Sequence, residues 1–256
     1  MLLAVDIGNT NIVLGCIEND GILFRERIST DQTATDLEYA ANLKIAMEMN
    51  GVDPKGINGA IISSVVPSLT NTVRMAIEKY IGADVMTVGP GIKTGLSILI
   101  DNPAQLGSDL AVDAVAGINE YEAPMIIIDM GTATTLSLID GKKSYRGGVI
   151  MTGVGVSAEA LVSKTAQLPK VSFDRPKKII GTNTVDCIRN GLLYSNACAI
   201  DGMVERIEEE LGQKCSVIAT GGLASTVIPL CKRKGIVVDD DLLLKGLNII
   251  YNKNKK

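Results

Sequence analysis

Hydrophobic and polar positions in the first third of the chain alternate in short blocks. An apolar run at 2–5 meets a single acid, Asp6, and the small polar turn GNTN follows at 8–11; a second, mostly apolar stretch occupies 12–18. Asn19 and Asp20 before a glycine form a hairpin signal, and a third run continues to residue 29. The pattern predicts three consecutive strands, each paired with its neighbour.

A helical period follows this predicted meander. Thr35-Asp36 is a helix start signal and Asn50-Gly51 is a stop signal. Apolar residues recur between them at helical spacing; they are Leu37, Ala40, Ala41, Ile45 and Met49. The rest of the first half predicts a buried strand, a helix after Pro67, a short strand and another helix; these are expected at 59–66, 68–82, 84–89 and 109–121.

The second half repeats this order of elements. Three strands separated by the turns GTATT and GKK are followed by helices, one strand ending in a glycine pair, and two further helices; they are expected at 125–129, 136–140, 144–151, 157–165, 184–211, 215–222, 224–235 and 241–253. The helix at 184–211 contains two glycines, so we expect it to bend or break near one of them.

The two halves share a turn as well as an order. Asp6-x-Gly8-Asn9 and Asp129-x-Gly131-Thr132 each follow an apolar strand and precede a hairpin. Two α/β domains of similar topology, with a cleft between them, are therefore expected at 1–117 and 118–256. A Pro- or Ser-rich linker is absent near the boundary, so we expect the domains to touch closely.

Composition narrows the possible functions. The chain has 256 residues, 46% of them hydrophobic and 3% aromatic, and its net charge is −4. A pI near 5.0 and few aromatic residues argue against nucleic acid as a main partner. Histidine is absent from the sequence, so His-based triads and His metal sites are excluded. Acid–base chemistry must then use carboxylates, Lys, Tyr or Cys.

Cysteine usage and hydropathy indicate the compartment. The five cysteines include no CxxC pair, which is typical of reduced thiols in a cytoplasmic protein. An uncharged apolar run of about 18 residues is absent, so no membrane span is expected. The N-terminus lacks a basic region and Asp6 interrupts its apolar run, so no signal peptide is expected.

The repeated acid–glycine turn suggests phosphate chemistry. Glycine lets the backbone approach a ligand closely, and backbone N–H groups with small hydroxyls can hold phosphate oxygens. A carboxylate at the strand end can hold a cation against those phosphates. One such turn is more simply a β-turn with an Asx-type bond. Two copies at matching places in two repeated halves favour a nucleotide gripped from both sides.

Two other glycine motifs are weaker. GPGIKTG at 89–95 lacks the adjacent Gly-Lys-Ser/Thr of a P-loop, so a Gly/Pro turn is the better interpretation. GVGVSA at 153–158 fits the dinucleotide-binding pattern, but Pro169 interrupts any βαβ unit after it. We therefore exclude both alternatives.

Motifs along essentially the whole chain resemble those of the type III pantothenate kinases, within the actin and hexokinase superfamily. They are DIGNTNIVLG at 6–15, NPAQLGSD at 102–109, DMGTATT at 129–135, GGVIMTG at 147–153, TAQLP at 165–169, GTNT at 181–184 and TGGLA at 220–224. The resemblance implies an α/β fold of two actin-like (ribonuclease H-like) domains with a nucleotide cleft. It also implies ATP-dependent phosphorylation of pantothenate to 4′-phosphopantothenate, the first step of coenzyme A synthesis.

The resemblance also implies residue roles. Asp109 would be the general base; its local sequence alone favours a helix N-cap, and the series of motifs reverses that preference. Asp129 would bind potassium or ammonium, and magnesium would accompany the nucleotide. ATP would contact Asp6, Ile7, Gly8, Asn9, Thr10, Asn11, Ile12, Val13 and Thr132, and pantothenate would contact Gly107, Ser108, Asp109, Leu110 and Thr184. The active form would be a cytoplasmic homodimer with the acceptor pocket near its interface.

Three positions depart from the family pattern. Leu110 stands where an arginine usually follows the catalytic aspartate, Ile100 replaces a tyrosine, and Thr152 replaces a proline. Leucine cannot imitate the five-donor fork of an arginine. Two alternatives therefore remain: a weak or inactive paralogue that binds nucleotide or pantothenate in regulation, and a kinase for another hydroxy acid.

Overall fold

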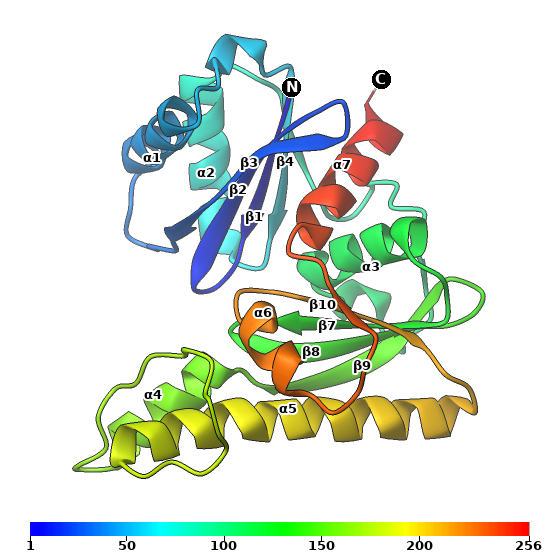
Figure 1. The fold of residues 1–256 in the computed structure, drawn as a ribbon. Helices are drawn as coiled ribbons and strands as arrows, with labels where there is room; N and C mark the ends of the chain where they lie inside the picture. The colour runs from blue at the N-terminus through cyan, green and yellow to red at the C-terminus, as the bar shows by residue number, and fades with distance from the viewer. Residues whose placement is uncertain (256) are drawn as a thin grey trace. The chain divides into compact units, whose positions relative to one another are not determined.

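The computed structural model describes residues 1–255, which form two α/β units (Figure 1). Unit 1 contains Met1–Leu96, Asn102–Asn119 and the chain from Asp241 onward, and unit 2 contains Ser97–Asp101 and Glu120–Asp240. This division differs from the expected 1–117 and 118–256. The main boundary is close to the expected one, but the C-terminal helix belongs to unit 1.

Unit 1 is built on a five-stranded sheet with the order β3-β2-β1-β4-β5. The three-strand meander predicted from the sequence is confirmed, since β1 pairs antiparallel with β2 and β2 with β3. β4 and β5 add parallel strands on the other side of β1. The strands are β1 Leu2–Ile7, β2 Asn11–Glu18, β3 Gly21–Ser29, β4 Gly59–Ser64 and β5 Val85–Thr87.

Helices cover both faces of this sheet, as Figure 1 shows. Alternate residues of β1 point to opposite faces: Leu3 and Val5 enter the core with α1 and α2, whereas Leu2 and Ala4 enter the core with α3 and α7. The helices are α1 Asp36–Met49, α2 Pro67–Tyr80, α3 Ser108–Glu120 and α7 Leu242–Asn254.

The packing of α7 explains why the C-terminal helix belongs to unit 1. Leu244 lies in the same buried cluster as Leu2 and Ala4 of β1. It packs so closely that a Cβ at Gly15 of β2 would lie 2.6 Å from Leu244 Cδ1. A sequence pattern shows that α7 is apolar on one side but not which sheet it covers.

The first helix is confirmed, but most of the residues that it buries are not the apolar residues whose spacing predicted it. Thr35 is the N-cap and forms a capping box with Glu38. Leu37 and Met49 are exposed, at 64% and 77%, while Leu43 and the residues around it pack on the sheet. The helix therefore carries apolar side chains on two sides.

Unit 2 repeats the central arrangement of unit 1 in a six-stranded sheet with the order β11-β10-β7-β8-β9-β6. β7 pairs antiparallel with β8 and parallel with β10, as β1 pairs with β2 and β4. The repeat inferred from the sequence is thus present in the backbone. The strands are β6 Ser97–Ile98, β7 Met125–Met130, β8 Ala133–Ile139, β9 Ser144–Thr152, β10 Ser216–Thr220 and β11 Ile236–Val238. Short β6 and β11 were not expected.

Two helical predictions in unit 2 were wrong. α5 runs from Thr184 to Leu211 without a break (Figure 1), because one glycine costs only about 1 kcal/mol in a helix and buried residues on both sides of Gly202 hold it. The helix expected at 224–235 is limited to α6, Ala224–Val227, since Pro229 ends it in a short 3₁₀ turn. α4, Val154–Lys164, starts before the expected residue 157.

Three 3₁₀ turns complete the described elements; they are Pro54–Gly56, Pro103–Gln105 and Ile228–Leu230. Among residues 1–255, no helix has the length and hydropathy that a membrane span requires.

Candidate functional site

The first acid–glycine turn joins β1 to β2 at one end of the unit 1 sheet. Asp6 is 9% exposed and lies between Val13 and Ser63 in the strand register. The N–H of Gly8 donates to the carbonyl oxygen of Asn11 at 3.0 Å, and a Cβ at Gly8 would lie 2.9 Å from that oxygen. Only glycine fits this turn without a shift of the backbone.

The expected ATP contacts in this turn differ in exposure. Asn9 and Thr10 are exposed, and Asn11 is half-buried. Ile7 and Ile12 are fully buried in the core of unit 1. Their side chains cannot meet a ligand, so any contribution of these two residues must come from the backbone.

Thr30, directly after β3, supports the first turn and was missed by sequence reasoning. Its hydroxyl donates to the carbonyl oxygen of Gly8 at 2.6 Å, and its N–H donates to the carbonyl oxygen of Thr10 at 3.0 Å. The register of the β2–β3 hairpin could have identified it: Asn11 pairs with Ser29, so residue 30 lies beside the turn that precedes Asn11.

Ser108 fixes the start of α3 to the end of β4. Its hydroxyl oxygen accepts from the hydroxyl of Ser63 at 3.0 Å and from the N–H of Ser64 at 3.1 Å, and the hydroxyl donates to the carbonyl oxygen of Ser64 at 3.0 Å. Ser63 is the register partner of Asp6. The structure therefore brings the first turn and the segment before Asp109 to the same end of the unit 1 sheet.

Asp109 lies inside the first turn of α3 rather than at its N-cap. The N–H of Ala111 donates to the carbonyl oxygen of Gly107, which makes Gly107 the capping position. The Asp109 carboxylate accepts from the N–H of Leu110 at 2.8 Å, and a Cβ at Gly107 would overlap it. Burial raises the pKa of Asp109. Hydrogen bonds from the backbone N–H groups of Leu110 and Asp109 lower this pKa, but their effect is smaller than that of burial.

The second acid–glycine turn joins β7 to β8 in unit 2. Asp129 is half-buried, while Gly131 and Thr132 are exposed. The N–H of Gly153 donates to the carbonyl oxygen of Thr132 at 3.2 Å, and a Cβ there would overlap the carbonyl oxygens of Gly131 and Thr132. The GGVIMTG motif thus ends in a glycine that supports this turn.

The TGG motif lies against the same turn. Thr220 of β10 pairs with Asp129, and Gly221 follows with a φ of +92°. A Cβ at Gly221 would lie 2.5 Å from Asp129 Oδ1 and 2.6 Å from the nitrogen of Met130. Gly221 therefore requires glycine for both its conformation and its contact.

Metal-binding chemistry at Asp129 is limited to oxygen. Among residues 1–255, no group of three or more His, Cys, Asp or Glu side chains could hold a metal ion. A cation beside Asp129 would take its remaining ligands from hydroxyl and carbonyl oxygens, which suits a hard cation and not a zinc-type site.

Thr184 lies in a pocket of about 710 Å³ in unit 2, between α4 and the start of α5. Leu161, Leu168, Ile188 and Leu192 supply apolar walls. The remaining lining residues are small or polar; they are Gly181, Thr182, Asn183, Thr184, Cys187, Gly191 and Ser195. This lining does not include Asp129 or Thr132, so within unit 2 the structure gives two separate features.

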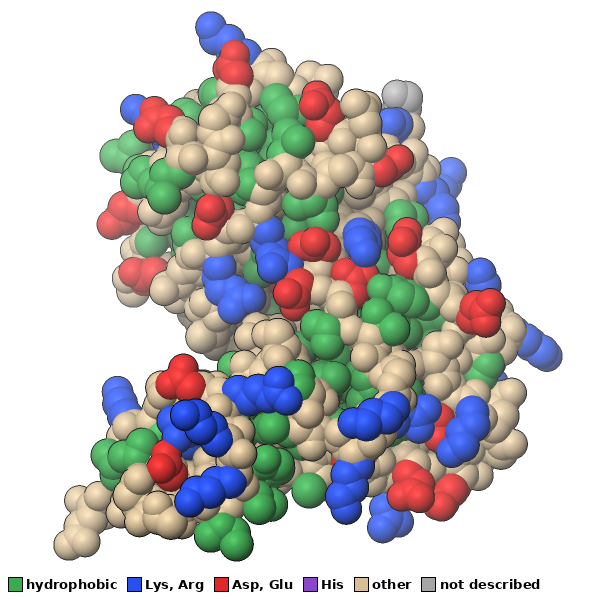
Figure 2. Space-filling view, in the orientation of Figure 1, with side chains coloured by type: hydrophobic (Ala, Val, Ile, Leu, Met, Phe, Trp, Pro, Cys, Tyr) green, Lys and Arg blue, Asp and Glu red, His purple; other side chains and the backbone are tan. Residues whose placement is uncertain are grey.

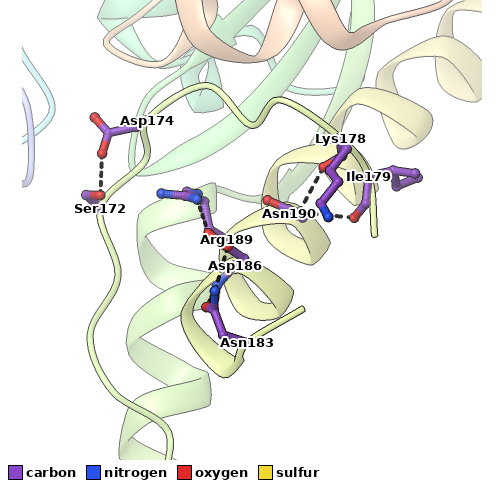
Figure 3. A network of polar contacts seen from close by, with 8 residues as sticks. All are labelled: Ser172, Asp174, Lys178, Ile179, Asn183, Asp186, Arg189 and Asn190. Atoms are coloured by element: carbon purple, nitrogen blue, oxygen red, sulfur yellow. Dashed lines mark hydrogen bonds and ion pairs between the residues drawn. The ribbon is translucent and has the colours of Figure 1, made fainter. Parts of the chain in front are cut away.

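Polar contacts hold the segment before α5 in place (Figure 3). Asn183 caps the helix: its side-chain oxygen accepts from the N–H of Asp186 at 2.9 Å, and its amide nitrogen donates to the Asp186 carboxylate at 2.7 Å. Arg189 pairs with the same carboxylate. Asn190 donates to the carbonyl oxygens of Lys178 and Ile179 at 2.9 and 3.2 Å.

The segment beside this pocket is basic in a chain that is acidic overall. Its cationic side chains are exposed; they are Lys164, Lys170, Arg175, Lys177 and Lys178. Figure 2 shows Lys and Arg side chains gathered at the end of unit 2 that carries α4. Such a cluster raises the local concentration of anionic ligands.

The chain matches known sequences over its full length. The family model for type III pantothenate kinase matches residues 2–206. A type III pantothenate kinase from Exiguobacterium sp. is 41% identical over 256 residues and covers 100% of both chains. One from Brevibacillus brevis is 42% identical over 257 residues, again with 100% of both chains covered.

Solved structures share the fold at low identity. A Baf family transcriptional activator from Campylobacter jejuni is 16% identical with a TM-score of 0.61, and 98% of each chain is covered. The activator of the 2-hydroxyisocaproyl-CoA dehydratase from Clostridium difficile is 15% identical with a TM-score of 0.55, covering 100% of this chain and 98% of that one. The predicted fold class, α/β with two similar actin-like domains, is confirmed; the expected cleft stays a prediction.

Proposed function

The chain belongs to the type III pantothenate kinase family, and from that premise we propose that it transfers the γ-phosphoryl group of ATP to the hydroxyl of pantothenate. The products are 4′-phosphopantothenate and ADP, which makes the reaction the first step of coenzyme A synthesis. The observation that carries the proposal is the full-length match to these kinases. The position of Asp109 supports it, because the neighbouring Ser108 is hydrogen-bonded to Ser63 of β4, the register partner of Asp6.

Asp109 acts as the general base in this proposal. The acceptor hydroxyl gives its proton to the Asp109 carboxylate while its oxygen attacks the γ-phosphorus and ADP leaves. Burial raises the pKa of this carboxyl group, which makes the ionised form a better proton acceptor. The bond from the N–H of Leu110 keeps the carboxylate in one orientation.

We assign ATP to the two acid–glycine turns. The first turn, around Gly8, offers exposed Asn9 and Thr10 and backbone groups held by Thr30. Thr132 is exposed in the second turn. Phosphoryl transfer depends mainly on positioning and on neutralising charge, and both turns are rigid enough for this because each has a hydrogen bond from a distant residue.

Asp129 fits a monovalent cation, potassium or ammonium. Its carboxylate lies beside the turn of Thr132, and hydroxyl and carbonyl oxygens are the other donors at hand. A cation there would neutralise phosphate charge. Magnesium would enter with the nucleotide, bound chiefly by the phosphates.

The pocket of Thr184 is the proposed acceptor pocket. Its apolar walls suit the dimethyl-substituted carbon chain of pantothenate, and its hydroxyl-bearing residues suit the amide and hydroxyl groups. The nearby basic segment favours an acceptor with a carboxylate. Gly107, Ser108 and Leu110 are proposed acceptor contacts on the separate segment of unit 1 that carries Asp109.

A homodimer in the cytoplasm is part of the same proposal. The segment that borders the acceptor pocket carries three exposed apolar side chains, Ile179, Ile180 and Val185. A second copy of the chain would bury them in an interface. The two exposed cysteines, Cys187 and Cys198, suit a reducing compartment.

Leu110 and Ile100 are the two features that favour a second candidate. Without the arginine and the tyrosine of the family pattern, an acceptor carboxylate loses a charged partner and a hydroxyl. The chain could then bind nucleotide or pantothenate without turnover, or phosphorylate another hydroxy acid. A coupled ADP-release assay with ATP, potassium and a panel of hydroxy acids decides between these functions. ADP release that depends on pantothenate supports the proposal; release with another acid alone replaces it.

A further inference from the structure

Thr135 of β8 has a hydroxyl that the fold leaves without a partner. Its Oγ1 is buried and makes no hydrogen bond. A buried polar atom of this kind costs about 1–3 kcal/mol, so native proteins seldom keep one unless a water, an ion or a functional role accounts for it.

The strand register places this hydroxyl beside Asp129. Thr135 is the direct partner of Asp129 in the antiparallel pair of β7 and β8, and directly opposed residues point to the same face of a sheet. Thr220 is the partner of Asp129 on the other side, in β10. The carboxylate thus has a hydroxyl residue on each neighbouring strand.

The opposite face of β8 is different in kind. Leu136 and the neighbours of Asp129 in β7, Ile128 and Met130, enter the apolar core of unit 2. Thr134 points to that core, and its hydroxyl is also buried without a hydrogen bond. Two adjacent threonines therefore carry the same orphaned group on opposite faces, and only one of them lies next to a carboxylate.

Other oxygens border the space beside Asp129. A Cβ at Gly131 would lie 3.5 Å from Asp129 Oδ2 and 3.6 Å from the carbonyl oxygen of Ala133. Gly221 closes the other side of the carboxylate. Carboxylate, carbonyl and hydroxyl oxygens are the ligands that hard cations take in proteins.

We infer that the hydroxyl of Thr135 is a ligand of the monovalent cation at Asp129, so that the site is a shared site of β7 and β8. The inference rests on the proposed function, which puts a cation at Asp129. It accounts for the orphaned hydroxyl at Thr135, and it assigns a residue whose role is to hold the cation rather than to touch the reacting atoms.

The test is cation binding measured without turnover. The melting temperature of the protein is followed as potassium replaces sodium at constant ionic strength, since a ligand that binds the native state raises it. We expect Thr135→Val to raise, by about 10-fold or more, the potassium concentration that gives a fixed rise in melting temperature. Thr134→Val, the matched control on the same strand, should leave that concentration unchanged, and Thr135→Ser, which keeps the hydroxyl, should restore the wild-type response.

The outcomes separate this inference from the function on which it rests. If Thr135→Val and the wild type need the same potassium concentration for that rise while Asp129→Asn loses the response, Thr135 is not a ligand and the inference is refuted. If the wild type shows no potassium response at all, both the cation and its threonine ligand are refuted, while pantothenate-dependent ADP release would still establish the kinase. Should Thr135→Val fold poorly, Thr135→Ser and Thr135→Ala decide by the same potassium concentration.

Discussion

The hydroxyl of Thr30 donates a 2.6 Å hydrogen bond to the carbonyl oxygen of Gly8, across 22 positions of the chain. With the N–H bond from Thr30 to Thr10, it attaches the first acid–glycine turn to the end of β3. The turn therefore does not depend on its own four residues for its shape. A residue outside the glycine motif fixes the backbone that is proposed to meet the phosphates.

Replacing Thr30 with valine should weaken ATP binding while the fold persists. The backbone bond to Thr10 survives, but the bond to Gly8 is lost, a contribution of about 0.5–1.5 kcal/mol or roughly 2- to 10-fold in affinity. Calorimetric titration with ATP measures the change. Thr33→Val removes an exposed hydroxyl that bonds only to Asp31 and should bind ATP normally; equal affinities for both variants would contradict this role for Thr30.

Replacing Gly221 with alanine should disturb the second turn specifically. The positive φ alone costs a non-glycine residue about 1–2 kcal/mol, and the new Cβ would also displace Asp129 and Met130. Gly212→Ala is the control, because Gly212 has a φ of +71° but open space around it. We expect a lower melting temperature in both variants and a loss of turnover, about 100-fold, in Gly221→Ala alone. Similar turnover in the two would count against Asp129 in the reaction.

Replacing Leu110 with arginine should improve pantothenate binding. Leu110 follows Asp109 in the first turn of α3 and is half-buried. A charge-assisted hydrogen bond to the acceptor carboxylate contributes about 1.5–3 kcal/mol, so the KM for pantothenate should fall at least tenfold with a smaller change in kcat. Leu37→Arg, on the exposed side of α1, controls for added charge. A raised KM in Leu110→Arg would mean that another residue holds the carboxylate.

Glu208 should stabilise unit 2 in a pH-dependent way. Burial disfavours its charge, but hydrogen bonds from Arg233 and Lys214 and from the N–H of Cys215 outweigh burial and lower the pKa to about 2. Because the folded pKa lies below the unfolded value of about 4.3, the stabilisation is complete above that pH and is lost as pH falls toward 2.

Urea unfolding measures this effect. Glu208→Gln should lower the free energy of unfolding by about 3 kcal/mol at pH 7, and the gap to the wild type should narrow below about pH 4.3. The control is Glu78→Gln, which breaks an exposed pair with Arg74 and should change the free energy by less than about 1 kcal/mol. A gap that stays constant down to acid pH would refute the role of the Glu208 charge.

The features predictable from the sequence are those set by neighbouring residues. The apolar run and glycine turn at Asp6 and their copy at Asp129 specify strand, turn and strand locally, and both were found as expected. What the sequence could not give depends on distant partners: α7 covers the sheet of unit 1 through Leu244, and Thr30 reaches Gly8 across the meander. The sequence also predicted a bend or break at a glycine of α5, but the helix continues through Gly202 because tertiary packing overrides helix propensity.

The central claim is that this chain phosphorylates pantothenate with Asp109 as the base. Its most direct test is ADP release with ATP and potassium, measured against pantothenate concentration for the wild type and Asp109→Asn side by side. We expect saturable, pantothenate-dependent release by the wild type, and a variant that melts at the wild-type temperature or above yet turns over about 100-fold more slowly. Equal rates for the two proteins would remove Asp109 from the mechanism, and a wild type that binds ATP but never responds to pantothenate would contradict the function itself.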